Sequence, residues 1–337
     1  MILGYVEPSG ESPGLAAAEL AAAVEALGGR VVVGEPAALE GVVAVAVPQR
    51  SVLVDLASRL ALARRVLLPV AGPGVPALQA AVRAGRDGGS AAFRRIGRPS
   101  GSADRAVREA GRAFVGAGGS IDLEEPSRRF WIAEGPDTAE TLLVEVASVD
   151  RPSFGARTMP RLPFQRPVSL PPRLARAAAN LAGIVPGATV LDPFLGTGAL
   201  LAEAALLGAR VFGIDRDARM VRGALANLAY LGLEAEALAQ GDARTVDLRV
   251  PEGGFDAILT DPPYGRSSGL GGEEPVALCR AVLDRWQAEL APDGILSIVV
   301  PGGPPSVGPP WAEEVRVPVR VHRSLTREFR RYVRRTD

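Results

Sequence analysis

The sequence predicts a mixed α/β protein whose C-terminal half folds as a doubly wound parallel sheet. Short apolar strands alternate with helices from about residue 171 to residue 301, as is typical of such a sheet. Acidic residues follow successive strands, and ligands bind at the carboxyl ends of the strands in this fold class. A proline-rich stretch separates this half from an N-terminal part in which helices and strands alternate less regularly.

Composition indicates a globular protein with room for two domains. Of the 337 residues 47% are hydrophobic and 23% are charged, which are ordinary proportions for globular chains. A single cysteine excludes a disulfide framework, and a single histidine leaves too few ligands for a metal cluster, so no metal is expected. No apolar run approaches the ~18 residues of a membrane span, and the start MILGYVEPSGE lacks the basic region of a signal peptide. We therefore expect a cytoplasmic protein without membrane contact.

Arginine supplies the whole basic charge. The 38 basic residues include no lysine, and the only asparagines are Asn180 and Asn227, which indicates a GC-rich genome or thermophilic adaptation. The net charge of zero argues against nucleic-acid binding over the whole surface, but clustered arginine forks suit phosphate. A solvated surface is the alternative for each cluster. The arginines predicted to contact phosphate are Arg94, Arg95, Arg98, Arg266, Arg327, Arg330 and Arg331.

The N-terminal part is expected to mix helices and strands. Strand, helix, strand and strand follow one another up to about Val47, and the helix in SPGLAAAELAAAVEALGG has a serine cap, an early proline and a glycine stop. Further helices are expected at 51–60, 75–85 and 103–116, and strands at 62–70, 91–96, near 120, 128–133 and 141–148. Residues 151–168 contain four prolines without apolar periodicity and are interpreted as a linker.

The C-terminal part has the regular alternation. Helices are expected at 171–183, 199–207, 217–231 and 274–290, and strands at 188–192, 210–215, 235–240, 255–261 and 295–301. In VLDPFLGTGALLAEA a strand ends at Asp192 and a glycine turn leads into a helix. Gly196 and Gly198 let the backbone approach a ligand, and free N–H groups at the start of the helix can bind an anion. A tight turn without a ligand is the alternative.

The next two strands add acids to this glycine turn. RVFGID ends at Asp215, where an acid can bind two ribose hydroxyls, and QGDAR places Asp242 where it can accept from an adenine amine. A nicotinamide dinucleotide is disfavoured because Leu201 stands where G-x-G-x-x-G requires glycine. The three acids indicate a ligand that contains adenosine.

The fourth strand leads into the stiff turn TDPPYG. Proline fixes φ, so Pro262 and Pro263 make a rigid corner with outward carbonyls. Together with LDPFLGTG, GID and GDA, this stretch resembles the S-adenosylmethionine-dependent amino-methyltransferases, which carry Asp or Asn before Pro-Pro-Tyr at this strand end. The resemblance implies that Asp261 and the Pro262 carbonyl each accept a hydrogen bond from a weakly nucleophilic amine of the substrate base. It also implies that Tyr264 stacks on that base. An ordinary Pro-Pro loop is the alternative.

Further motifs resemble the archaeal tRNA guanosine-10 N2-methyltransferases. They are RPVSLPPRLARAAANLAG, DPPYGRSS and VHRSLTREF, while residues 93–132 look like the later half of a THUMP domain, which recognises the acceptor end of tRNA. The resemblance implies a ferredoxin-like segment at 1–50, a THUMP domain at 51–150, a linker at 151–168 and a Rossmann-fold methyltransferase domain at 169–337. It implies S-adenosyl-L-methionine as cofactor, tRNA as partner and N2-methylguanosine or N2,N2-dimethylguanosine as product.

The resemblance also assigns roles to residues. The cofactor-binding residues are Asp192, Phe194, Gly196, Thr197, Gly198, Asp215, Arg216, Asp242, Ala243 and Asp261. The catalytic residues are Asp261, Pro262, Pro263 and Tyr264, and the phosphate-binding arginines become RNA contacts. The chain departs from the family pattern at Leu170, where histidine is usual, and at Leu195, where cysteine is common.

Other functions fit the same motifs. The chemistry could act on guanine N2 of rRNA or on adenine N6 or cytosine N4 of DNA, and a catalytically silent RNA-binding protein would keep the fold. A small partner subunit, the number of methyl groups and the choice of tRNA cannot be read from the residues.

Overall fold

The computed structural model describes most of the chain. The described residues are 1–34, 38–71, 80, 82, 89–135, 140–167, 169–263, 274–301, 307, 311–322 and 325–334. Contacts between Cα atoms divide the chain into two units. The first unit comprises 1–11, 27–58 and 63–149, and the second comprises 12–26, 59–62 and 150–337. No helix within the described ranges is long and apolar enough to span a bilayer.

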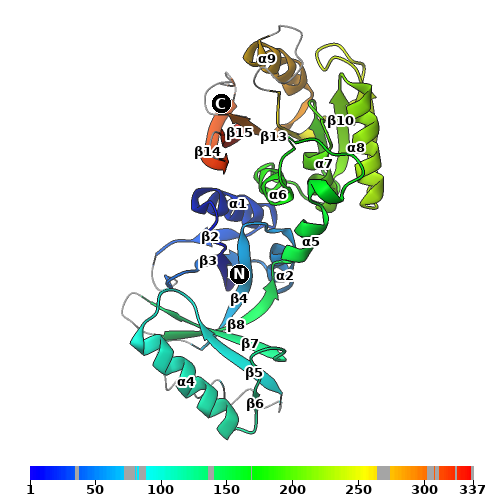
Figure 1. Ribbon diagram of the computed structural model, residues 1–337. Helices are drawn as coiled ribbons and strands as arrows, with labels where there is room; N and C mark the ends of the chain where they lie inside the picture. The colour runs from blue at the N-terminus through cyan, green and yellow to red at the C-terminus, as the bar shows by residue number, and fades with distance from the viewer. Residues whose placement is uncertain are drawn as a thin grey trace. The chain divides into compact units, whose positions relative to one another are not determined.

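The first unit contains an eight-stranded sheet with the order β2-β3-β1-β4-β8-β7-β5-β6 (Figure 1). Its strands are β1 (Ile2–Pro8), β2 (Arg30–Val32), β3 (Val43–Val47), β4 (Ala63–Ala71), β5 (Ser90–Arg95), β6 (Ser120–Ile121), β7 (Arg128–Glu134) and β8 (Glu140–Ser148). Its helices are α2 (Ser51–Arg59) and α4 (Gly101–Gly116). One sheet therefore spans both predicted N-terminal segments, and the division at residue 50 stays a prediction.

Helix α4 covers one face of this sheet (Figure 1). The Ser100 hydroxyl caps the helix by accepting from the Ala103 amide at 3.1 Å. Apolar residues recur every three or four positions and pack with Phe93 and Phe130, whose ring centroids lie 5.0 Å apart. These residues are Ala103, Ala106, Ala110, Ala113 and Phe114. The other side of the helix carries exposed arginines, namely Arg105, Arg108 and Arg112.

The second unit contains a seven-stranded sheet with the order β11-β10-β9-β12-β13-β15-β14. Its strands are β9 (Thr189–Asp192), β10 (Arg210–Asp215), β11 (Ala237–Gln240), β12 (Phe255–Thr260), β13 (Leu290–Pro301), β14 (Trp311–His322) and β15 (Leu325–Arg334). Its helices are α1 (Pro13–Ala26), α5 (Arg151–Ala156), α6 (Pro172–Leu181), α7 (Ala199–Leu206), α8 (Ala218–Tyr230) and α9 (Pro275–Trp286). The first five strands in this order are parallel, and β15 and β14 run antiparallel.

The order of the parallel strands reverses between β9 and β12, which creates a switch point at their carboxyl ends. Helix α9 packs on this sheet through an apolar face in which Trp286 is fully buried. The Trp286 indole N–H donates to the Ala243 carbonyl at 2.7 Å, which secures the loop after β11. These features confirm the predicted Rossmann-like alternation of strands and helices.

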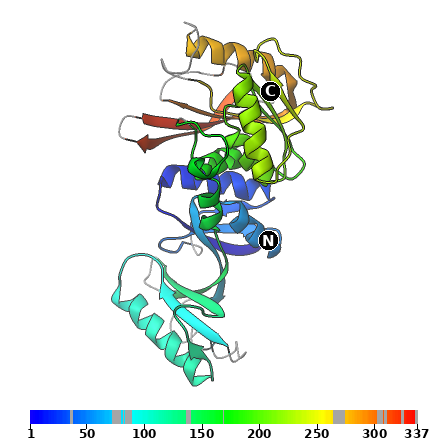
Figure 2. The same ribbon diagram turned by 45° about the vertical axis from the view of Figure 1, so that its right-hand side comes forward.

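Three predictions about elements need correction or comment. The sequence did not predict strands after residue 301, but β14 and β15 form a long C-terminal hairpin, seen at the red end of the colour range in Figure 2. The segment interpreted as a linker contains α5, whose first turn is capped by Asp150. The predicted helix 75–85 lies mostly outside the described residues.

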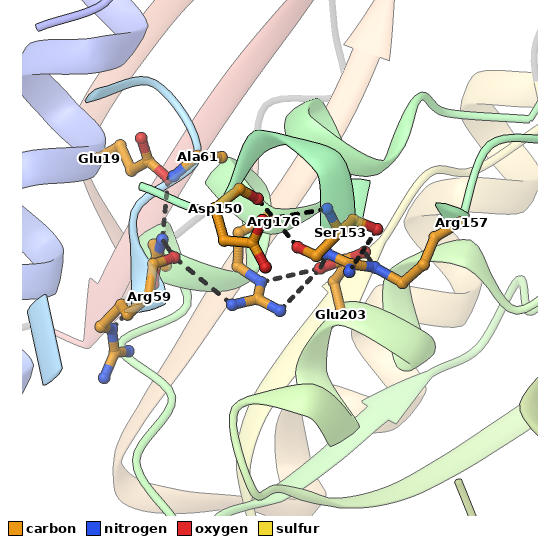
Figure 3. A network of polar contacts seen from close by, with 9 residues as sticks. Glu19, Arg59, Ala61, Asp150, Ser153, Arg157, Arg176 and Glu203 are labelled. Atoms are coloured by element: carbon orange, nitrogen blue, oxygen red, sulfur yellow. Dashed lines mark hydrogen bonds and ion pairs between the residues drawn. The ribbon is translucent and has the colours of Figure 1, made fainter. Parts of the chain in front are cut away.

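A buried polar network explains why α1 belongs to the second unit (Figure 3). Glu19 of α1 accepts from the Ala61 and Leu62 amides, both at 2.8 Å, and from the Asn180 side-chain amide at 2.9 Å. Asn180 of α6 also accepts from Arg59 Nε at 2.8 Å. Residues 12–26 and 59–62 are thus joined to α6 by hydrogen bonds that are buried from water.

Neighbouring ion pairs extend this network toward α7. Glu203 is 2% exposed and pairs with Arg176 at 2.8 Å and with Arg157 at 2.7 Å. Figure 3 shows both guanidinium groups turned toward the same carboxylate. Because both partners are charged, the carboxylate stays compensated although it lies inside the protein.

Candidate active site

The acids predicted at the strand ends lie at one edge of the second unit's sheet. Asp192 ends β9, Asp215 ends β10, and Asp261 directly follows β12. Asp242 follows β11 by two residues. The charges of Asp261 and Asp215 both act on Asp192, which shows that the three carboxylates are near one another. The switch point of the sheet therefore carries a cluster of negative charge.

The glycine turn after β9 is held by two of these carboxylates. Asp192 Oδ1 accepts from the Phe194 amide at 3.0 Å and from the Thr260 hydroxyl at 2.7 Å. Asp215 accepts from the Gly196 amide at 2.9 Å. Gly196 has φ +51 and Gly198 has φ +77, a conformation that side chains with Cβ rarely adopt. The two acids thus fix a turn whose backbone requires glycine.

Burial shifts the protonation of the two innermost acids. Loss of solvation raises the pKa of Asp192 to about 7, although the Thr260 hydroxyl and the Phe194 amide act in the opposite direction. Burial likewise raises the pKa of Asp261 to about 7 against the opposing charge of Arg327. Asp215 has its pKa raised for the same reason. A bound cation would favour the ionised forms of all three.

Asp261 has one paired and one unpaired oxygen. Its Oδ2 accepts from Arg327 Nη1 at 2.8 Å, whereas Oδ1 is buried and has no hydrogen-bond partner among the described residues. Leaving a buried acceptor unpaired costs about 1–3 kcal/mol, so such an atom indicates a place for a donor other than the described residues. Pro262 is buried and Pro263 is partly buried. The predicted roles of Tyr264 and Arg266 fall outside the described residues.

The loops after β10 and β11 carry the remaining predicted cofactor residues. Both oxygens of Asp242 accept from Arg244, and the hydrogen bonds from this side chain lower the pKa of Asp242 to about 2. Ala243 is buried and its peptide is held by α9. Arg216 is exposed. Its charge adds to the lowering of the pKa of Asp242 and opposes the burial that raises the pKa of Asp215. The predicted adenine contact at Asp242 would have to share the carboxylate with Arg244.

The arginines predicted to contact RNA divide into two groups. In the C-terminal group the side chains are buried: Arg327 is 4% exposed, Arg330 1% and Arg331 6%. Arg330 pairs with Glu328, and Arg331 pairs with Glu314 at 2.9 Å. The predicted RNA contacts of these three arginines stay a prediction. In the structure their side chains are buried, and each pairs with a carboxylate: Asp261, Glu328 and Glu314.

The N-terminal arginines lie differently. Arg94 and Arg98 are exposed, and Arg94 donates to the Leu123 carbonyl at 2.8 Å. Arg95 is partly buried and pairs with Asp104 at 2.8 Å. This group remains open to a polyanion, as do the exposed arginines of α4 described above.

The residues at the strand ends fit S-adenosylmethionine, the cofactor that the resemblance implies. A Cβ built on Gly196 would meet only the Phe194 carbonyl, at 3.9 Å, so the turn leaves room for a ligand against its backbone. Helix α7 begins directly after Gly198 without a side-chain cap, which leaves N–H groups for a carboxylate. The cluster of Asp192, Asp215 and Asp261 suits a sulfonium, because a positive charge relieves their mutual repulsion.

Sequence reasoning missed a buried amide that supports this turn. Asn227 of α8 donates to the Thr197 carbonyl at 3.1 Å and to the Phe164 carbonyl at 2.9 Å, and accepts from the Phe164 amide at 2.9 Å. The Ser169 and Thr197 hydroxyls lie 2.9 Å apart, so residues 164–169 are tied to the turn twice. The scarcity of asparagine was the available signal, since both asparagines of the chain are buried and make three hydrogen bonds each.

Replacing Asn227 tests this support. Asn227→Ala should lower the free energy of unfolding by about 2 kcal/mol, because buried polar groups lose their partners, and should weaken the binding of S-adenosylmethionine. Denaturant unfolding and calorimetric titration measure the two effects. Arg222→Ala, at an exposed position of the same helix, is the control and should change neither. Unchanged cofactor affinity in the Asn227 variant would contradict the proposed support of the turn.

The two departures from the family pattern are apolar contacts in the structure. Leu170 and Leu195 are both buried, at 3% exposure each. Leu195 lies under the turn beside Gly213, where an added Cβ would come within 2.9 Å of its side chain. A hydrophobic residue of this size therefore fits the position that cysteine often occupies.

Comparison with known proteins agrees with this geometry. Residues 161–304 match the family model described as RMKL-like, methyltransferase domain. The tRNA (guanine(10)-N2)-dimethyltransferase of Methanothermobacter thermautotrophicus is 37% identical over 216 residues, which are 62% of this chain and 62% of that protein. The enzyme of the same name from Pyrococcus abyssi is 39% identical over 182 residues, or 52% of this chain and 53% of that protein. The chain thus spans less than two thirds of the curated relatives it matches.

A solved structure matches over a longer range. The crystal structure of TrmN from Thermus thermophilus has a TM-score of 0.53 and 24% sequence identity, and the match covers 99% of this chain and 100% of that one. At this identity the match concerns the fold alone. It includes the strands of both units.

Proposed function

We propose that this chain, whose residues 161–304 match the family model described as RMKL-like, methyltransferase domain, methylates the exocyclic N2 amine of a guanosine in tRNA. S-adenosyl-L-methionine is the methyl donor that this family implies, and when bound it supplies an electrophilic methyl group on a positively charged sulfur. The expected products are N2-methylguanosine and N2,N2-dimethylguanosine. The target is position 10, as in the names of the archaeal relatives.

One observation carries the proposal, namely that Asp261 Oδ1 is buried and has no hydrogen-bond partner in the described ranges. It is a buried acceptor directly after β12, at the strand edge where the three carboxylates suit a sulfonium. The lone pair of an amine on a purine ring is delocalised, so the amine needs orientation to react. An ionised acceptor that takes one amine hydrogen turns the lone pair out of the ring plane and lets the proton leave after transfer.

The rigid corner supports this role. Pro262 and Pro263 restrict the backbone after Asp261, so the acceptor is held with little loss of entropy when substrate binds. The Pro262 carbonyl is the proposed second acceptor, and Tyr264 the proposed stacking partner of the base. The hydroxyl of Thr260, the last residue of β12, donates to Asp192 at 2.7 Å. This hydrogen bond joins the glycine turn after β9 to the rigid turn that begins at Asp261.

The first unit is proposed to bind tRNA. Its exposed arginines on α4 and next to β5 form a local basic surface in a chain of zero net charge, which suits contact with phosphates. We assign to it the ferredoxin-like segment and the THUMP domain that the sequence predicts. The names of the relatives, which all refer to tRNA, support this partner.

Methyl transfer to tRNA tests the function. Unmodified tRNA that carries guanosine at position 10, incubated with the protein and methyl-labelled S-adenosylmethionine, should yield labelled N2-methylguanosine in mass spectra of its nucleosides. A transcript with adenosine at position 10 is the matched control and should stay unlabelled. Preferential labelling of rRNA or duplex DNA would show that one of these, and not tRNA, is the substrate. Absence of transfer to all three would overturn the proposal.

A further inference from the structure

The C-terminal hairpin brings a buried arginine to the proposed catalytic acid. Strand β15 runs antiparallel to β13, and Arg327 lies opposite Pro301, the last residue of β13. The start of β15 is therefore at the same sheet edge as Asp261. Arg327 is 4% exposed, and its Nη1 donates to Asp261 Oδ2 at 2.8 Å.

We infer that Arg327 is a positioning residue, which orients the Asp261 carboxylate so that Oδ1 is presented to the substrate amine and keeps that carboxylate ionised. The inference rests on the proposed function for its catalytic meaning. Its geometric basis is the different surroundings of the two carboxylate oxygens of Asp261. Oδ2 is bound to the guanidinium, and Oδ1 is buried without a partner in the described part of the chain.

Arginine suits both tasks. Its guanidinium remains charged at any physiological pH and holds a carboxylate in a defined orientation. Burial acts against ionisation of Asp261, and the charge of Arg327 acts for it. A protonated carboxyl would carry a hydrogen of its own and could not accept with both oxygens.

The other charges around Asp261 do not supply this compensation. Among the described residues, the charged groups that face Asp261 are Arg327 from β15 and Asp192 from β9. Asp192 is itself an acid, so it adds repulsion. Within this set Arg327 is the positive group that favours an ionised Asp261.

The substitutions Arg327→Gln and Arg327→Lys test the inference. Turnover is measured from pH 6 to pH 9, where it should rise with pH in the wild type because Asp261 acts in its ionised form. In R327Q this rise should move to higher pH by about one to three units, the usual effect of an adjacent opposite charge on an acid. At pH 7 turnover should fall about 5- to 500-fold, in proportion to the loss of the ionised form, and should recover partly as the pH is raised.

Arg327→Lys separates charge from orientation. In R327K turnover should be lower, but it should still rise near the same pH as in the wild type. The reason is that an ammonium keeps the positive charge but lacks the planar guanidinium that orients the carboxylate. Arg316→Gln is the matched control in the same hairpin, since Arg316 is exposed and pairs with Glu313 away from the site. It should leave the pH profile and turnover unchanged.

A direct titration needs no substrate. Carbon-13 NMR of protein labelled at aspartate carboxyls, with the Asp261 signal identified from Asp261→Asn, should show titration near pH 7 in the wild type and at higher pH in R327Q. An unchanged carboxyl titration in R327Q would overturn the inference. So would a loss of turnover by one constant factor at every pH, or an R327K profile shifted as far as that of R327Q. Absence of methyl transfer by the wild type would instead reject the proposed function, while the titration would still decide the role of Arg327.

Discussion

Asp261→Ala should lower the turnover of methyl transfer about 10²- to 10³-fold, the usual effect of removing one preorganised group that acts on the reacting atoms. Its Oδ1 directly follows β12 and is a buried acceptor without a partner in the part of the chain that the structure describes, and alanine offers no replacement. Affinity for S-adenosylhomocysteine, which lacks the sulfonium charge, should change little, because the glycine turn is held by Asp192 and Asp215. Single-turnover kinetics and calorimetric titration with S-adenosylhomocysteine measure the two quantities.

The asparagine variant is the matched comparison. Asp261→Asn keeps the shape of the side chain but only one acceptor oxygen, for which the Arg327 donor and the substrate amine compete. It should therefore lose most of the turnover, as the alanine variant does, and should also lose the pH dependence that Asp261 causes. The alanine variant also leaves Arg327 buried without its carboxylate, so its thermal unfolding must be recorded beside its kinetics. If Asp261→Ala stayed folded and lost cofactor binding, the role of Asp261 in orienting the amine would be wrong.

The acids of the site could be predicted from sequence because each one is a local signal. Asp192 and Asp215 follow short apolar strands, and Asp261 precedes two prolines, so their place at one sheet edge follows from parallel strand order. The partner of Asp261 gives no such signal. Arg327 is 66 residues further on, and only the register of β15 against β13 brings the two together.

The C-terminal arginines show the same limit of local reasoning. A strand with many charges suggests a solvated surface, yet Arg330 and Arg331 are buried because carboxylates from β14 and β15 compensate them. Charge pairing across strands depends on register, which a single strand does not reveal.

Apart from α5, which lies in the predicted linker, the helices of the described ranges agree with prediction because their ends carry local signals. Ser100 before α4 and the prolines at the start of α1 and α6 are examples. The division of the chain into units was not accessible in this way. Helix α1 joins the second unit through Glu19, whose partner Asn180 lies 161 residues away in sequence. A contact of that separation depends on the whole fold.

Glu19→Ala should therefore cost about 3–9 kcal/mol of the free energy of unfolding, since it leaves three buried donors without this acceptor at about 1–3 kcal/mol each. The donors are the Ala61 and Leu62 amides and the Asn180 side chain. Glu19 is fully buried, so water cannot replace the carboxylate without opening the contact between α1 and α6. Urea unfolding followed by circular dichroism measures the loss.

Glu25→Ala is the matched control, because Glu25 lies on the same helix with its side chain 70% exposed and only a 3.3 Å contact to Arg331. It should change the free energy of unfolding by less than about 1 kcal/mol, the usual range of exposed ion pairs. Glu19→Gln should lie between the two, because its amide keeps one acceptor oxygen but points a donor at another donor. Equal stability of the Glu19 and Glu25 variants would mean that α1 is held by apolar packing alone, and that the buried carboxylate only fills the space between the segments it touches.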